Sequence, residues 1–171
     1  MKLDPYSEDV ISFVTISVET CILLEHVSEL EKNDFIEKLL LYLPLLYQKT
    51  RLLGRADESA ENYVGHYVEE SDYNMITAGV KEVLRNDDAY LEVFIDDMRY
   101  SDTPITCFIS ENLADIYQEL KNMALNYHEQ TSEVMIEAIY ACIDAFYEHW
   151  GQKLLNSLRA LHNIDINDLS E

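Results

Sequence analysis

The chain has 171 residues, of which 48% are hydrophobic and 26% charged, and this length and composition fit one globular domain with a single core. The 33 acidic residues outnumber the 12 basic ones and give a formal net charge of −21. Because binding to a phosphate backbone or an anionic lipid surface depends on clustered Lys and Arg, this charge argues against nucleic-acid binding and membrane docking, and it favours a basic protein partner.

The first predicted helix spans about residues 7–30. Ser7 is suited to cap it, and Glu8 and Asp9 follow in the first turn, where negative charge is favourable. Apolar side chains recur every three or four residues and form one face: Val10, Phe13, Val14, Val18, Cys21, Leu24 and Val27. The preceding segment "MKLDPYSEDV" is too acidic for the start of a signal peptide, which predicts a cytoplasmic protein.

A second predicted helix spans about residues 34–53. It is apolar on nearly every side from Phe35 onward, so we expect it to be the central and most buried helix. Its densest apolar run, "LLLYLPLLY" from Leu39 to Tyr47, has nine residues and is less than half of a membrane span. No membrane-spanning segment is therefore predicted.

Residues 54–70, "GRADESAENYVGHYVEE", are polar, acidic and without sustained helical periodicity, so we predict an excursion on the surface. A third helix is expected from Ser71 or Asp72 through Arg85. The following segment, "NDDAYLEVFIDDMRYSD", has apolar residues at helical spacing and predicts a short helix or distorted turns.

The next predicted helix begins at Thr103 or Ser110 and ends near Glu129. Its apolar seam alternates steps of four and three residues: Ile109, Leu113, Ile116, Leu120, Met123 and Tyr127. At about 100° per residue, Glu111 and Asp115 point well away from this seam, so we expect them to face water.

The last predicted helix begins after Thr131 or Ser132 and keeps one apolar face almost to His162. Gly151 interrupts it, which predicts a bend or a close helix contact. The tail, residues 165–171, is expected to fray. Together these elements predict a single all-α domain, a largely antiparallel bundle of five to six helices with a polar excursion near residues 54–70.

Sequence patterns for cofactor chemistry are absent. P-loop, dinucleotide-binding, EF-hand and His-Glu-x-x-His patterns do not occur, and no histidine has the Glu-x-x-His spacing of a di-iron bundle. We therefore predict no cofactor and no catalytic residue, and the balance is against an enzyme. Cys21, Cys107 and Cys142 are odd in number and lie in apolar patterns, which predicts buried, reduced thiols.

One polar turn is a candidate site: Arg99, Tyr100, Ser101, Asp102 and Thr103. Its five hydrogen-bonding side chains precede a predicted helix N-terminus, where an anion is favoured. They support, as one alternative, a small-molecule binder or an enzyme that uses this turn. The same residues also suit a plain helix start, because Thr103 is a good N-cap and Pro104 fits the first helical position.

Two further groups of polar residues are weaker candidates. A stripe beside the apolar seam of the last helix forms a secondary candidate patch: Gln152, Lys153, Asn156 and Arg159. We predict no metal site, and the weaker alternative is a divalent-metal site built from acidic residues between 87 and 97: Asp87, Asp88, Glu92, Asp96 and Asp97.

Four stretches carry a resemblance to a known family: "LLLYLPLLYQK", "DDAYLEVFIDDMRYSDTP", "YSDTPITCFISENLADIYQELKNM" and "WGQKLLNSLRALH". They resemble an uncharacterised bacterial all-helical family, domain of unknown function 5063 (DUF5063). The resemblance implies a cytoplasmic helical domain and supplies no catalytic residues.

The leading hypothesis is a non-catalytic interaction or regulatory protein whose acidic surface meets a basic patch on another protein. It depends on the charge asymmetry and on the missing catalytic patterns. The sequence leaves the identity of the partner and the oligomeric state open.

Overall fold

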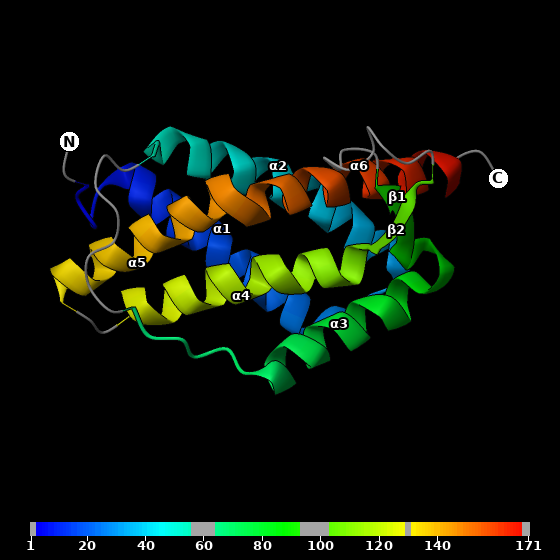
Figure 1. Ribbon diagram of the computed structural model, residues 1–171, viewed down its shortest axis with the longest axis horizontal. Coiled ribbons are helices and arrows are strands. Elements are labelled where there is room, and N and C mark those ends of the chain that lie inside the picture. The colour runs from blue at the N-terminus through cyan, green and yellow to red at the C-terminus, as the bar shows by residue number, and fades with distance from the viewer. Residues whose placement is uncertain (1–2, 56–63, 93–102, 129–130, 169–171) are drawn as a thin grey trace.

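A computed structural model describes residues 3–55, 64–92, 103–128 and 131–168, and Figure 1 shows how their helices are arranged. Six α-helices make up most of this part of the chain: α1 (Glu8–Glu25), α2 (Lys32–Leu53), α3 (Glu70–Leu84), α4 (Ile109–Tyr127), α5 (Ser132–Ala145) and α6 (Gly151–Asp168). Two short strands, β1 (Ala89–Glu92) and β2 (Ile105–Phe108), form a small sheet. The predicted all-α class is confirmed.

Side-chain caps set the starts of several helices. Ser7 Oγ accepts a hydrogen bond from the Val10 amide at 3.5 Å, as its predicted capping role requires, and Thr131 caps α5 in the same way. The third helix begins earlier than expected, because Glu69 and Asp72 form a capping box in which each side chain accepts from the other's backbone amide.

The centre of the bundle is α4, and the prediction that the second helix is central is wrong. α4 packs against α1, α3, α5 and α6, and Figure 1 shows it running between α5–α6 and α3. α2 packs mainly on α1 and α6 and exposes three leucines on its outer side: Leu41, Leu45 and Leu52. A helix is buried only where other elements pack on it. α2 has α1 and α6 as its main neighbours, so its remaining side stays exposed although it is apolar.

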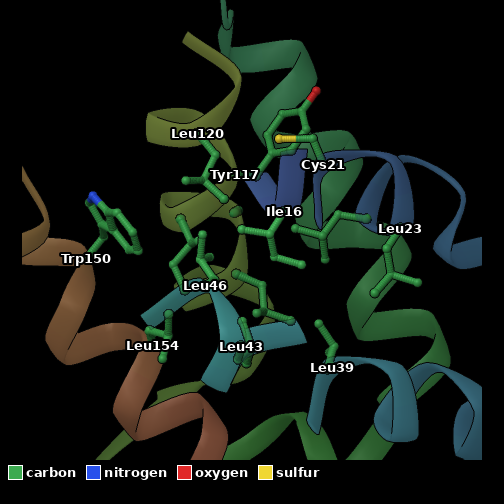
Figure 2. Packing of buried hydrophobic residues seen from close by; sticks show 14 of the residues in the cluster. Ile16, Cys21, Leu23, Leu39, Leu43, Leu46, Tyr117, Leu120, Trp150 and Leu154 are labelled. Carbon is green, nitrogen blue, oxygen red and sulfur yellow. The ribbon is translucent and has the colours of Figure 1, made fainter. Parts of the chain in front are cut away.

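The core lies where α1, α2, α4 and α6 meet. Figure 2 shows side chains from these elements gathered in one cluster, including Leu43, Leu120 and Leu154, which are all fully buried. Trp150 is also fully buried, and its Nε1–H donates a hydrogen bond to the Cys142 carbonyl at 2.9 Å. The indole therefore packs in the core with its single polar group satisfied.

A two-stranded hairpin occupies a region for which the sequence predicted helix or turns. β1 and β2 pair in antiparallel register, with Ala89 opposite Phe108. A helix start at Thr103 is therefore wrong, and α4 begins at Ile109, next to the predicted alternative Ser110. The sequence of β2 is "ITCF", and such β-branched and aromatic residues favour a strand over the first turn of a helix.

Asp88 holds the start of α4 from outside the helix. It ends the 3₁₀ turn Arg85–Asp88 and is 2% exposed. Its two carboxylate oxygens accept hydrogen bonds from the amide and the hydroxyl of Ser110, at 2.7 Å each. That amide is one of the donors that lack a partner inside the helix, so Asp88 replaces the side-chain cap that Phe108 does not provide.

α5 and α6 form one long path interrupted by the π-helical turn Phe146–Trp150. A Cβ atom at Gly151 would lie 2.6 Å from the Phe146 carbonyl oxygen, so glycine is needed directly after this turn. The sequence predicted a bend or a close helix contact at Gly151, and the structure has instead a π-helical turn that ends directly before this residue. α6 continues to Asp168 and residues 169–171 lie outside the described part, so the fraying expected for residues 165–171 stays a prediction.

Residues 64–69, the end of the predicted excursion, run in extended form beside α4. Asn122 Oδ1 accepts hydrogen bonds from the amides of Tyr67 and Val68, at 2.8 and 3.0 Å. One turn later, Asn126 binds both the amide and the carbonyl of Gly65, at 3.0 and 2.7 Å. These two asparagines fasten the segment to the bundle just before α3 begins.

Candidate functional site

The polar turn predicted as a site falls almost wholly outside the described residues. Arg99, Tyr100, Ser101 and Asp102 belong to the gap at 93–102, and Thr103 lies exposed at its end, two residues before β2. A pocket formed by this turn therefore stays a prediction.

One half of the secondary patch joins α3, α4 and α6 through Asp115. Lys153 forms an ion pair with this carboxylate, and the Tyr73 hydroxyl donates to it at 3.0 Å. Burial and the nearby Asp115 charge raise the pKa of Tyr73, so the phenol stays a hydrogen-bond donor at neutral pH. The side chain of Asp115 is 19% exposed, so its predicted water-facing position is wrong, whereas Glu111 is exposed as predicted.

The other half of the patch fastens α6 to the hairpin. The Asn156 side-chain amide donates to the Glu92 carboxylate at 2.6 Å, and the Gln152 amide donates to Asn156 Oδ1 at 3.0 Å. Arg159, the fourth residue of the predicted patch, is exposed on the same helix. Gln152, Lys153 and Asn156 are bonded to one another or to neighbouring elements, so this part of the patch acts as a connection between elements.

The three cysteines are free thiols. Cys21 and Cys142 are buried as predicted, whereas Cys107 is half-buried in β2. Burial raises the pKa of Cys21 to about 12 and also raises the pKa of Cys107 and of Cys142. The thiolate is the form that attacks electrophiles and binds metal ions, so at neutral pH these protonated thiols are poor nucleophiles and poor ligands.

The acidic residues of the metal hypothesis bond to separate partners. Asp87 pairs with Lys32 at 2.6 Å, while Asp88 binds Ser110 and Glu92 binds Asn156. Asp96 and Asp97 lie outside the described residues. Within the described ranges, no group of three or more His, Cys, Asp or Glu side chains is placed to hold a metal ion.

A groove between α1 and α2 is the site that sequence reasoning missed. Its volume is about 660 Å³, and ten residues line it: Tyr6, Glu8, Ile11, Ser12, Thr15, Ile16, Glu19, Tyr42, Leu45 and Lys49. Ile11 on α1 is 49% exposed and Leu45 on α2 is 40% exposed, so apolar side chains from both helices meet water at its mouth.

The apolar surface continues along both helices beyond the groove. On α1, Val18 and Ile22 are exposed seven and eleven residues after Ile11. On α2, Leu41 and Leu52 are exposed on the same side as Leu45. Steps of three, four and seven residues keep a side chain on one face of a helix, so each helix carries a second apolar stripe besides its core stripe. The signal was in the sequence as apolar residues on nearly every side of α2.

The charge on the two walls of the groove is uneven. α1 carries four acidic residues and no Lys or Arg, and two of them, Glu8 and Glu19, line the groove. At 1.5 Å per residue, they are separated by about 16 Å along the helix and lie on the same side of it. Lys49 is the single Lys or Arg among the ten lining residues. The groove is thus apolar inside, with acidic groups along its α1 wall.

Comparison with known proteins places the chain in a family. Its sequence matches the model of a domain of unknown function, DUF5063, over residues 4–167. Its fold is similar to that of protein BF1032 from Bacteroides fragilis, a crystal structure with a TM-score of 0.82 and 32% sequence identity, in a match that covers 94% of each chain. No curated protein matches the sequence.

No helix in the described ranges is both long enough and apolar enough to cross a bilayer. The family match extends over residues 4–167, and the solved relative shares the fold over 94% of the chain. The protein therefore belongs to the DUF5063 family, as the resemblance in its sequence predicted.

Proposed function

We propose that the protein is a non-catalytic interaction or regulatory protein of the cytoplasm, and that its acidic surface meets a basic patch on another protein. The observation that carries this proposal is the α1–α2 groove, an apolar surface left uncovered on a chain of net charge −21. Contiguous exposed apolar surface marks interaction sites, and a strong charge of one sign selects partners of the opposite sign.

The described polar groups support the non-catalytic part of the proposal. Lys153 and Tyr73 both bond to Asp115, and burial holds the cysteines in the protonated form by raising their pKa. A catalytic site needs a nucleophile or a base that is free to react. Three free cysteines also suit a reducing compartment, which is the reason for placing the protein in the cytoplasm.

The test is affinity purification from native lysate at low ionic strength with the full chain as bait. An unrelated helical protein of similar net charge serves as the control bait, because it retains proteins that bind any acidic surface. We expect a partner with a basic surface that is specific to this chain and is released as salt is added. Recovery of the same proteins on both baits would contradict the proposal.

A further inference from the structure

We propose that the groove between α1 and α2 binds a basic amphipathic helix of a partner protein. This inference rests on the proposed function and deepens it, because it assigns the contact surface and the kind of segment that fits it. Three observations carry it: the shape of the groove, the state of the backbone in its walls, and the position of its charges.

The shape fits a helix. α1 and α2 pack side by side, and the buried side chain of Ile16 and the half-buried side chain of Tyr42 form the base between them. Exposed apolar residues, Ile11 and Leu45, stand on the two sides. A third helix with apolar residues every three or four positions can place its ridge between two such helices and bury its apolar face.

The backbone of the groove offers no sheet edge to which a partner could add a β-strand. A segment that binds as an added strand needs the amides and carbonyls of a sheet edge as hydrogen-bond partners. The lining residues from Glu8 to Lys49 all belong to α1 and α2, whose backbone groups are bonded within each helix. The backbone groups of a helical partner are hydrogen-bonded within that helix, so it needs only apolar contacts and opposite charges from the groove.

The charges select a basic partner over a second copy of this chain. Glu8 and Glu19 lie on the same side of α1, about 16 Å apart, so a helix lying along α1 meets both if it carries Lys or Arg about eleven residues apart. A second copy would bring a net charge of −21 against an equal charge, and the lining of its own groove has two acidic residues and a single basic one, Lys49.

The test uses a defined probe. The probe is a fluorescent amphipathic peptide of about 18 residues, roughly 27 Å long as a helix, with Leu on one face and Lys on the other. Two control peptides have the same residues in scrambled order, or Glu in place of Lys. We expect the full chain to bind the probe, to increase its helicity on binding, and to bind both control peptides at least about tenfold more weakly.

Matched variants locate the binding site. Ile11→Ser with Leu45→Ser removes apolar surface inside the groove, and we expect the Kd for the probe to rise about tenfold or more. Met75→Ser with Leu155→Ser removes exposed apolar surface from α3 and α6, and we expect less than about a twofold change. All four side chains are at least 40% exposed, and thermal unfolding confirms that each variant remains folded.

The charge is tested in the same way. Glu8→Gln with Glu19→Gln should raise the Kd for the probe by about threefold to tenfold at low salt and reduce the dependence of this Kd on salt. Glu37→Gln with Glu133→Gln, exposed carboxylates outside the groove, removes the same total charge and should have a smaller effect.

The outcomes separate this inference from the proposed function. If a basic partner is found in lysate but binds the Ile11→Ser, Leu45→Ser variant as tightly as the unaltered chain, the groove assignment is wrong and the proposed function stands. If the scrambled peptide binds as tightly as the probe, the amphipathic order of the residues does not matter and the occupant is not an amphipathic helix. If the unaltered chain is a dimer and the Ile11→Ser, Leu45→Ser variant is a monomer, the occupant of the groove is a second copy of the chain and not a basic helix. If no basic partner is found, the proposed function itself fails.

Discussion

α4 and the outer side of α2 reverse the usual relation between polarity and burial. α4 buries three asparagines: Asn112, Asn122 and Asn126. α2 exposes three leucines: Leu41, Leu45 and Leu52. The asparagines are tolerated because they have hydrogen-bond partners on the hairpin, on residues 64–69 and within α4 itself, whereas the leucines have no helix packed over them in the described part of the chain. Burial follows from the number of neighbours around a helix, and the comparison can be tested by substitutions on the two sides.

The largest difference is expected between two leucines of the two helices. Leu120→Ala in α4 removes a fully buried side chain and leaves a cavity, so the free energy of unfolding should fall by about 3–4 kcal/mol. Leu41→Ala in α2 removes a side chain that is 66% exposed, and the loss should be within about 0.5 kcal/mol. Urea unfolding followed by circular dichroism measures both. A loss above 2 kcal/mol for Leu41→Ala would mean that another molecule, or a second copy, covers α2 in solution.

A medium effect is expected where a buried charge holds the start of α4. Asp88→Ala leaves the amide and the hydroxyl of Ser110 without their acceptor, and the free energy of unfolding should fall by about 2–3 kcal/mol. Asp88→Asn keeps one acceptor oxygen and should lose less. Urea unfolding gives the stability, and amide hydrogen exchange at Ser110 should become faster in the alanine variant. If the Asn and Ala variants are equally stable, the carboxylate is not what fixes this helix start.

The local features of the fold could be predicted from the sequence. Ser7 caps α1 and the seam through Leu113 and Leu120 is buried, because caps and periodicity act within a few residues. The sheet could not be predicted, since a four-residue strand has no clear period and depends on a distant partner, as Ile105 does on Glu92, thirteen residues earlier in the chain.

Little of the candidate site could be predicted. Asp115 lies far from the apolar seam of α4 in helical phase, but α4 has neighbours on several sides, so Asp115 still meets α3 and α6. The groove was missed for the opposite reason. The apolar residues around α2 predicted complete burial, and nothing local in the sequence distinguishes Leu43, which lies in the core, from Leu45, which lines the groove.

The smallest effect concerns Glu119, a half-buried carboxylate on α4. Burial raises the pKa of Glu119, the nearby Asp115 adds to this rise, and His149 and His66 oppose it. Because the folded-state pKa lies above the 4.5 of an ordinary glutamate, the folded chain holds this proton more tightly than the unfolded chain does. The resulting stabilisation is complete below the unfolded pKa and is lost as the pH rises through the folded pKa.

Glu119→Gln imitates the protonated form at every pH and therefore isolates this contribution. At pH 7 the variant should be more stable than the unaltered chain by roughly 0.5 kcal/mol, and the difference should shrink toward pH 4, where both side chains are neutral. Urea unfolding between these pH values measures the difference, with the exposed Glu37→Gln as the matched substitution on α2. A variant that is less stable at pH 7 would show that the charge of Glu119 is needed by His149 or His66. In that case the polar residues of α4 would follow the same rule as Asp115, for which a charged partner compensates burial.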